Sequence, residues 1–139
     1  WLYEVDAGAT TVWERWDALD ENGLSKTGDD GTGGMVSFNH YAFGAVGDFF
    51  YRRIAGIEPA SGGYKSFQIR PVPGDSLVWA RGSVDTPYGK IVSSWKKEGG
   101  RYSISVEIPM GTSCTLTMPS GKTHFLSCGE YTFFEPIGN

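Results

Sequence analysis

Hydrophobic and polar positions change their spacing near residue 60, and this change divides the chain into two regions. Before that point, apolar residues recur at helical intervals between glycine-rich interruptions. Beyond it, they alternate with polar residues at the two-residue period of a β-strand. Residues 59–63, Pro-Ala-Ser-Gly-Gly, are of the types that interrupt regular structure. We therefore predict one domain over residues 1–59 and a second over residues 60–139.

The first region predicts two helices. Residues 1–6 have the pattern of a helix end, which Gly8 terminates, whereas residues 10–13 are β-branched or aromatic and predict extended or irregular structure. A longer helix is predicted from Ser37, a good N-cap residue, to Gly56. Its apolar residues follow helical spacing: Phe38, Ala42, Ala45, Val46, Phe49 and Phe50. Such an apolar face needs to pack against other helices, which this sequence does not supply. We therefore expect the chain to be a piece of a longer protein.

Exposure of that face would have a direct consequence. If the chain folds alone, we expect it to self-associate through residues such as Phe49 and Phe50.

A polar, acidic, glycine-rich stretch over residues 20–34 separates the two helices and predicts a long surface loop. Such a composition raises the question of calcium. The glutamate that an EF-hand needs at its fixed offset after the glycine is absent. We therefore predict no metal site and no cofactor.

The second region predicts an antiparallel β-sandwich. Its candidate strands cover residues 66–70, 77–84, 91–97, 101–108, 113–118, 123–126 and 131–134. Turn signals at 85–89, 98–100 and 119–121 separate several of them. Pro71 and Pro73 close the first strand, which we place at a sheet edge. The expected fold class is α+β, with a short helical part followed by the sandwich.

The large aromatic residues and the cysteines each allow two interpretations. Trp13 and Trp16 can stack on a sugar ring, and Trp79 and Trp95 can form a carbohydrate-binding platform. We favour core packing for all four. The two cysteines, Cys114 and Cys128, can pair across a hairpin or remain unpaired core thiols, and we favour the second.

Charge and hydropathy exclude two classes of partner. The chain has 139 residues with a formal net charge of −4 and contains no cluster of lysine and arginine, so we predict no nucleic-acid surface. No apolar run approaches the roughly 20 residues that cross a membrane as a helix. We therefore predict no membrane partner.

Glu14 and His40 are the candidate functional residues. Glu14 lies between two indoles and beside Arg15, and can serve as a general base or nucleophile for glycosyl transfer. Spacing alone favours a structural glutamate paired with a cation. His40 occupies the third helical position if Ser37 is the cap, where its imidazole can bond a sugar hydroxyl or a backbone carbonyl. His124 lies in a predicted strand, and we assign it a structural role.

Four segments resemble the C-terminal end of the bacterial α-L-rhamnosidases, an inverting glycoside hydrolase family. They are GATTVWERWD at 8–17, SFNHYAFGAVGDFFYRRIAGI at 37–57, GGYKSFQIRPVPG at 62–74 and DTPYGKIVSSW at 85–95. The resemblance covers nearly the whole chain. It implies that the helical region is the last part of a catalytic (α/α)₆ barrel and that the sandwich is the C-terminal domain.

The resemblance also implies roles and partners. Glu14 falls on the general base of the WERW motif, and His40 falls on the histidine that contacts rhamnose. The implied partners are a rhamnose-containing glycoside or polysaccharide and the rest of the parent chain. The family's general acid lies in an upstream acidic motif that this sequence lacks, so we expect the chain alone to be inactive. For the sandwich we prefer a role in bracing the barrel over sugar binding.

Overall fold

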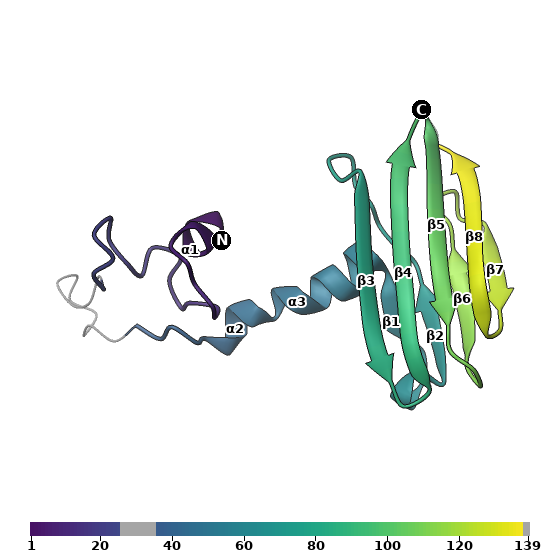
Figure 1. Cartoon of the computed structure of the whole chain (residues 1–139), viewed down its shortest axis with the longest axis horizontal. Helices are drawn as coiled ribbons and strands as arrows, with labels where there is room; N and C mark the ends of the chain where they lie inside the picture. Colours follow the sequence, from purple (N-terminus) through teal and green to yellow (C-terminus); the bar gives the residue numbers. More distant parts are fainter. Residues whose placement is uncertain (26–35, 138–139) are drawn as a thin grey trace. The chain divides into compact units, whose positions relative to one another are not determined.

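A computed structural model describes residues 1–25 and 36–137 of the chain (Figure 1). It divides into two compact units, Trp1–Gly47 and Asp48–Asn139. The predicted surface loop and its calcium question fall largely on residues 26–35, which lie outside the described residues. Its beginning is a tight turn, in which the Asp20 carboxylate accepts hydrogen bonds from the backbone N–H groups of Asn22 and Leu24, both at 2.8 Å.

The first unit begins with the short helix α1 (Leu2–Asp6). Gly8 follows it with a φ of 76°, a left-handed conformation that glycine adopts at low cost, which confirms the predicted helix and its end. Residues 10–13 are irregular, the second of the two predicted alternatives.

The second predicted helix starts later than expected. It begins with α2 (Tyr41–Gly44), continues as α3 (Val46–Phe49) and ends as the π-helical segment η1 (Phe50–Ala55). His40, not Ser37, is the N-cap residue. The prediction was wrong because backbone hydrogen bonds join Ser37 to Glu14 and His40 to Val12, and His40 itself has an extended backbone conformation. The predicted end is confirmed, since Gly56 follows η1 with a φ of 81°.

The predicted apolar face of this helix is largely uncovered, and Phe49 and Phe50 are 52% and 55% exposed. We expect the purified chain to form dimers or larger species at high concentration, because burying these rings removes apolar surface from water. Light scattering checks this, with a Phe49→Ser, Phe50→Ser double variant as the monomeric control. A single monomer peak for the unsubstituted chain at high concentration would contradict the prediction.

The second unit is a sandwich of two sheets. One contains β1 (Ile57–Pro59), β2 (Ser66–Ile69), β6 (Ser113–Thr117) and β7 (Thr123–Leu126) in that order. The other contains β3 (Trp79–Thr86), β4 (Gly89–Glu98), β5 (Arg101–Ile108) and β8 (Gly129–Pro136), also in that order. Figure 1 shows the two layers, and a short 3₁₀ turn, η2 (Gly62–Tyr64), lies between β1 and β2.

The predicted antiparallel sandwich is confirmed with two differences in detail. The β2 and β6 strands pair in parallel, whereas the other pairings are antiparallel. Moreover, β2 lies between β1 and β6, so placing it at a sheet edge was wrong. Pro71 and Pro73 lie beyond the end of β2, so they do not prevent it from pairing on both sides. The three residues of β1, just before the predicted domain boundary, are too few to show a strand pattern.

The core lies between the sheets and follows the predicted alternation. In β5, the residues Tyr102, Ile104, Val106 and Ile108 are buried. Trp95 of β4 stacks on Tyr102, with ring centroids 5.8 Å apart. Two side chains of β4 bind the last carbonyl groups of η1. The Trp95 indole N–H donates to Ile54 O and the Ser93 hydroxyl donates to Ala55 O, both at 2.7 Å. Burying a helix end requires such partners.

Several core assignments made for single residues were wrong. Trp79 is 64% exposed, because Ala80, Gly82 and Val84 occupy the inward positions of β3 and leave Trp79 on the outer face. Both cysteines are free, which confirms that preference, but only Cys114 is buried and Cys128 is exposed. Burial raises the pKa of the Cys114 thiol to about 12, so it stays protonated and unreactive at neutral pH.

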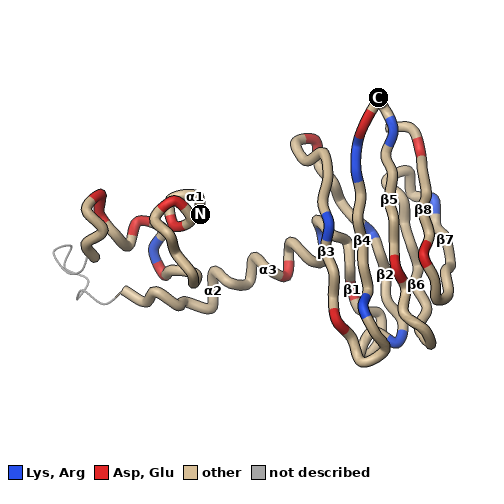
Figure 2. The backbone as a smooth tube through the Cα atoms, viewed as in Figure 1, with Lys and Arg blue, Asp and Glu red and all other residues tan. Residues whose placement is uncertain are grey.

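Charged residues of both signs are spread along the strands (Figure 2). None of the helices that the structure describes is long and apolar enough to cross a membrane. Within residues 1–25 and 36–137, no group of three or more histidine, cysteine, aspartate or glutamate side chains is arranged to hold a metal ion.

Candidate functional site

Backbone hydrogen bonds join the two segments that carry the candidate residues. The Glu14 N–H donates to Ser37 O, and the His40 N–H donates to Val12 O, both at 2.8 Å. The Thr11 hydroxyl also donates to the carbonyl oxygen of Phe38. Residues 11–14 and 37–40 are therefore fixed against one another within the first unit, although the whole predicted loop separates them in sequence.

The Glu14 carboxylate is held by the same pairing. Its Oε2 accepts a hydrogen bond of 2.8 Å from the Ser37 N–H, so Ser37 binds both the backbone and the side chain of Glu14. The neighbouring Arg15 instead pairs with Asp17, with 3.4 Å between Nε and Oδ1. No cation of the described residues forms a salt bridge with Glu14. The half-buried carboxylate is thus oriented by a backbone amide, which fixes its direction and leaves its second oxygen to other partners.

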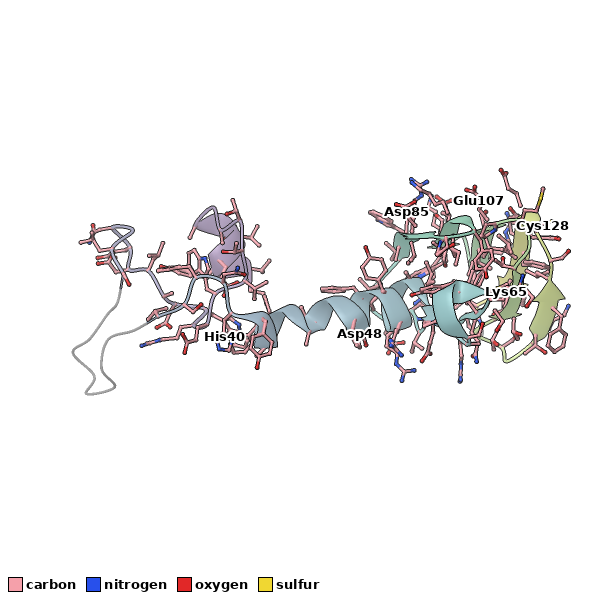
Figure 3. The ribbon with its side chains drawn as sticks, turned by 90° about the horizontal axis from the view of Figure 1, so that it is seen from below. His40, Asp48, Lys65, Asp85, Glu107 and Cys128 are labelled. Atoms are coloured by element: carbon pink, nitrogen blue, oxygen red, sulfur yellow. The ribbon has the colours of Figure 1, made fainter. Side chains whose placement is uncertain are left out.

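His40 lies at the start of α2 (Figure 3). Its ring stacks on Tyr41, with centroids 5.7 Å apart, and contacts Phe43 at 5.9 Å. Its Nδ1 atom is buried and has no hydrogen-bond partner within the described part of the chain. The alternative of a histidine bonded to a backbone carbonyl through this atom is therefore not observed. A buried polar nitrogen without a partner is uncommon and marks a place where a further group belongs.

Aromatic rings surround these polar groups. Trp13 is buried and packs edge-on against Phe38, with centroids 5.3 Å apart, which confirms its predicted core role. Trp16 differs from its prediction because it is 51% exposed. Its indole lies 6.0 Å from that of Trp1 and 6.1 Å from the ring of Phe43. The exposed Trp16 indole and the His40 imidazole thus both contact the ring of Phe43.

Sequence reasoning missed three features of this arrangement. Ser37 was expected to cap a helix but binds Glu14, and Thr11 was assigned no role. Glu4 in α1 is 3% exposed, and its Oε1 has no hydrogen-bond partner within the described residues. No local pattern predicts the first two roles, because they depend on pairing between distant segments. His124 lies in the sandwich, where its ring packs at a tilt against that of Phe133, with centroids 4.1 Å apart.

Two protein-family models match the chain. The model of the bacterial alpha-L-rhamnosidase C-terminal domain matches residues 56–130. The model of the bacterial alpha-L-rhamnosidase 6 hairpin glycosidase domain matches residues 1–54. The second unit, apart from its first residues, thus corresponds to the C-terminal domain model, and the residues of the candidate site correspond to the glycosidase model.

Individual relatives agree with these models. A protein of Formosa agariphila named alpha-L-rhamnosidase is 37% identical over 133 residues, which are 96% of this chain and 14% of that protein. A Streptomyces avermitilis protein of the same name is 37% identical over 120 residues, which are 86% of this chain and 11% of that protein. The chain therefore spans about one seventh or less of the length of these relatives.

Solved structures show the same similarity. The α-L-rhamnosidase of Aspergillus terreus superposes with a TM-score of 0.83 and 36% identity, covering 96% of this chain and 15% of that one. The Streptomyces avermitilis α-L-rhamnosidase in complex with L-rhamnose superposes with a TM-score of 0.81 and 30% identity, covering 96% of this chain and 14% of that one.

Proposed function

The chain belongs to the bacterial α-L-rhamnosidase family, and on this premise we propose that it carries the general base of an inverting rhamnosidase. The parent enzyme would be a glycoside hydrolase that releases terminal α-L-rhamnose from glycosides or polysaccharides. The observation that carries this proposal is the Glu14 carboxylate, oriented by the Ser37 amide in a segment fixed against that of His40. The names of the relatives and the L-rhamnose in one related structure support the substrate.

In this mechanism Glu14 acts on water. Its free carboxylate oxygen accepts a proton as the water oxygen attacks the anomeric carbon, while the bond from that carbon to the leaving oxygen breaks. A second carboxyl group, supplied by the rest of the parent chain, gives its proton to the leaving oxygen. Inverting enzymes hold the two groups about 6.5–9.5 Å apart so that the water fits between sugar and base. Orientation of the base by a backbone amide suits this task, because a displaced base loses its alignment with the water.

We propose that His40 binds the rhamnose. The exposed indole of Trp16 offers a flat apolar surface for the sugar ring, and it contacts the same Phe43 ring as the His40 imidazole. For the sandwich we propose a bracing role, supported by the hydrogen bonds that tie η1 to β4.

We expect the 139-residue chain to show no hydrolysis of an aryl α-L-rhamnoside, whereas the complete enzyme that contains it hydrolyses this substrate. The reason is that a base alone leaves the departing oxygen unprotonated. Release of the coloured phenol, followed at high protein concentration, measures both. Turnover by the isolated chain would contradict the division of the acid and the base between this chain and the rest of the enzyme. Inactivity of the complete enzyme on every rhamnoside tested would overturn the proposed substrate class.

A further inference from the structure

The second unit contains a cavity that the catalytic proposal does not use. It lies at the end of the sandwich where β4 and β8 finish and β5 begins, at the top in Figure 1. Its volume is about 550 Å³, within the usual range for small-molecule sites. The wall contains Pro73, Pro119, Pro136 and Ile137, and the polar groups come from Lys97, Tyr102, Ser120 and Glu135.

Three of these polar residues form one row across the sheet. Lys97 of β4 lies directly opposite Tyr102 of β5, which lies directly opposite Glu135 of β8. Directly opposed residues share a face of the sheet, so all three side chains lie on the inner face at the same end of the sandwich.

The two outer members of this row tie the mouth of the cavity together. The Glu135 carboxylate accepts hydrogen bonds from the Ser120 N–H at 3.0 Å and from the Ser120 hydroxyl at 2.6 Å. Lys97 donates to the carbonyl oxygen of Gly74. These contacts hold the β6–β7 turn and the loop before β3 against the sheet of β3, β4, β5 and β8. They leave hydrogen-bonding capacity unused, because an ammonium has three donors and a carboxylate accepts about four bonds.

The central member of the row has no partner. Tyr102 is 2% exposed, it lines the cavity, and its hydroxyl makes no hydrogen bond within residues 1–25 and 36–137. Burial, and to a lesser degree the charge of Glu135, raises the pKa of this hydroxyl. It therefore stays protonated at neutral pH and can donate a hydrogen bond. Buried hydroxyl groups are nearly always bonded, so this one is available to a group that enters from the cavity and displaces the side chains that cover it.

We propose that this cavity binds a neutral, polyhydroxylated ring of monosaccharide size, with the Tyr102 hydroxyl donating a hydrogen bond to one of its oxygens. The proline-lined wall suits the apolar face of such a ring. The unused donors of Lys97 and acceptors of Glu135 suit its hydroxyl groups. Asp75 adds a second carboxylate to the lining against one lysine, which disfavours an anionic sugar. The sandwich then holds a sugar site separate from the catalytic one.

The test is a titration of the 139-residue chain with L-rhamnose, followed by amide NMR. We expect a saturable shift of the Ser120 amide, because this group binds Glu135 at the mouth of the cavity. Tyr102→Phe should weaken the affinity about three- to tenfold, the effect of one hydrogen bond. It should not lower the unfolding temperature, since the hydroxyl has no partner in the protein. D-galacturonate should bind more weakly than L-rhamnose.

Two matched variants separate this site from other effects. Tyr131→Phe removes a tyrosine hydroxyl from the neighbouring strand β8, where it contacts Cys128 O at 3.4 Å, and should leave the Ser120 shift unchanged. His40→Ala, which removes the proposed rhamnose contact of the first unit, should also leave it unchanged. No saturable shift of Ser120, or equal affinity of Tyr102→Phe and the unsubstituted chain, would overturn the proposal. Sugar binding that weakens with His40→Ala but not with Tyr102→Phe would overturn this site while supporting the proposed role of His40.

Discussion

Glu14→Gln in the complete enzyme should lower kcat about 10²- to 10⁴-fold, the usual contribution of a general base. Glutamine keeps the size of the side chain and can still accept the hydrogen bond from the Ser37 N–H, so the local fold should survive. It cannot take a proton from water. KM should change little, because the water, not the sugar, is the partner of Glu14. Steady-state kinetics on an aryl α-L-rhamnoside measure both constants.

His40→Ala is the matched comparison. Because His40 is proposed to bind the sugar and not the water, its removal should act mainly on KM, with a change of about tenfold or less for one lost hydrogen bond. A second check uses an external nucleophile, since a small anion such as azide that needs no deprotonation should restore turnover in Glu14→Gln but not in His40→Ala. Wild-type kcat in Glu14→Gln would eliminate Glu14 as the base.

Gly56→Ala should be among the most damaging single changes to the sandwich. Gly56 has a φ of 81°, and a Cβ placed there would lie 2.3 Å from Pro71 N and 2.5 Å from Arg70 C. These are backbone atoms, held in place by the 2.8 Å hydrogen bond from the Arg70 N–H to Gly56 O. The left-handed conformation costs about 1–2 kcal/mol for alanine, and the overpacking costs about 1–3 kcal/mol. We therefore expect the free energy of unfolding to fall by about 2–5 kcal/mol, as measured by urea denaturation.

Gly99→Ala isolates the cause. Gly99 also has a positive φ, 57°, but a Cβ there would meet nothing within 4 Å. This variant should show only the conformational part of the loss, about 1–2 kcal/mol. If the free energy of unfolding falls equally in the two variants, the close approach of Pro71 to Gly56 does not contribute to the effect of Gly56→Ala.

The sandwich could be predicted from sequence because its strands alternate clearly. Tyr102 to Ile108 show the inward positions directly, and the turns around Gly89, Gly99 and Gly121 separate the strands. What could not be predicted was set by pairing. β1 carries no pattern of its own, and only its pairing with β2 makes it a strand. Trp79 carries the hydrophobicity of a core residue, but the register of β3 turns it outward.

The candidate site shows the same division. Glu14 and His40 could be chosen because a carboxylate and an imidazole stood in motifs that resemble those of a known family. Ser37 was misassigned because a serine before an apolar helix usually caps it. In this chain its amide is taken by Glu14, and helix α2 begins only after His40. The contact that orients the Glu14 carboxylate joins residues on either side of the stretch over residues 20–34, so no local pattern contains it.

The parallel pairing of β2 with β6 affects how the sandwich is assembled. The β3, β4 and β5 strands are joined by tight hairpins and can meet through neighbours in the sequence. β6 can meet β2 only by closing a loop that contains this entire meander. Loop closure costs entropy before the new contacts repay it, so the sheet of β1, β2, β6 and β7 is expected to complete last. On a ribosome, residues 57–69 would therefore wait for their partner strand until most of the domain has emerged.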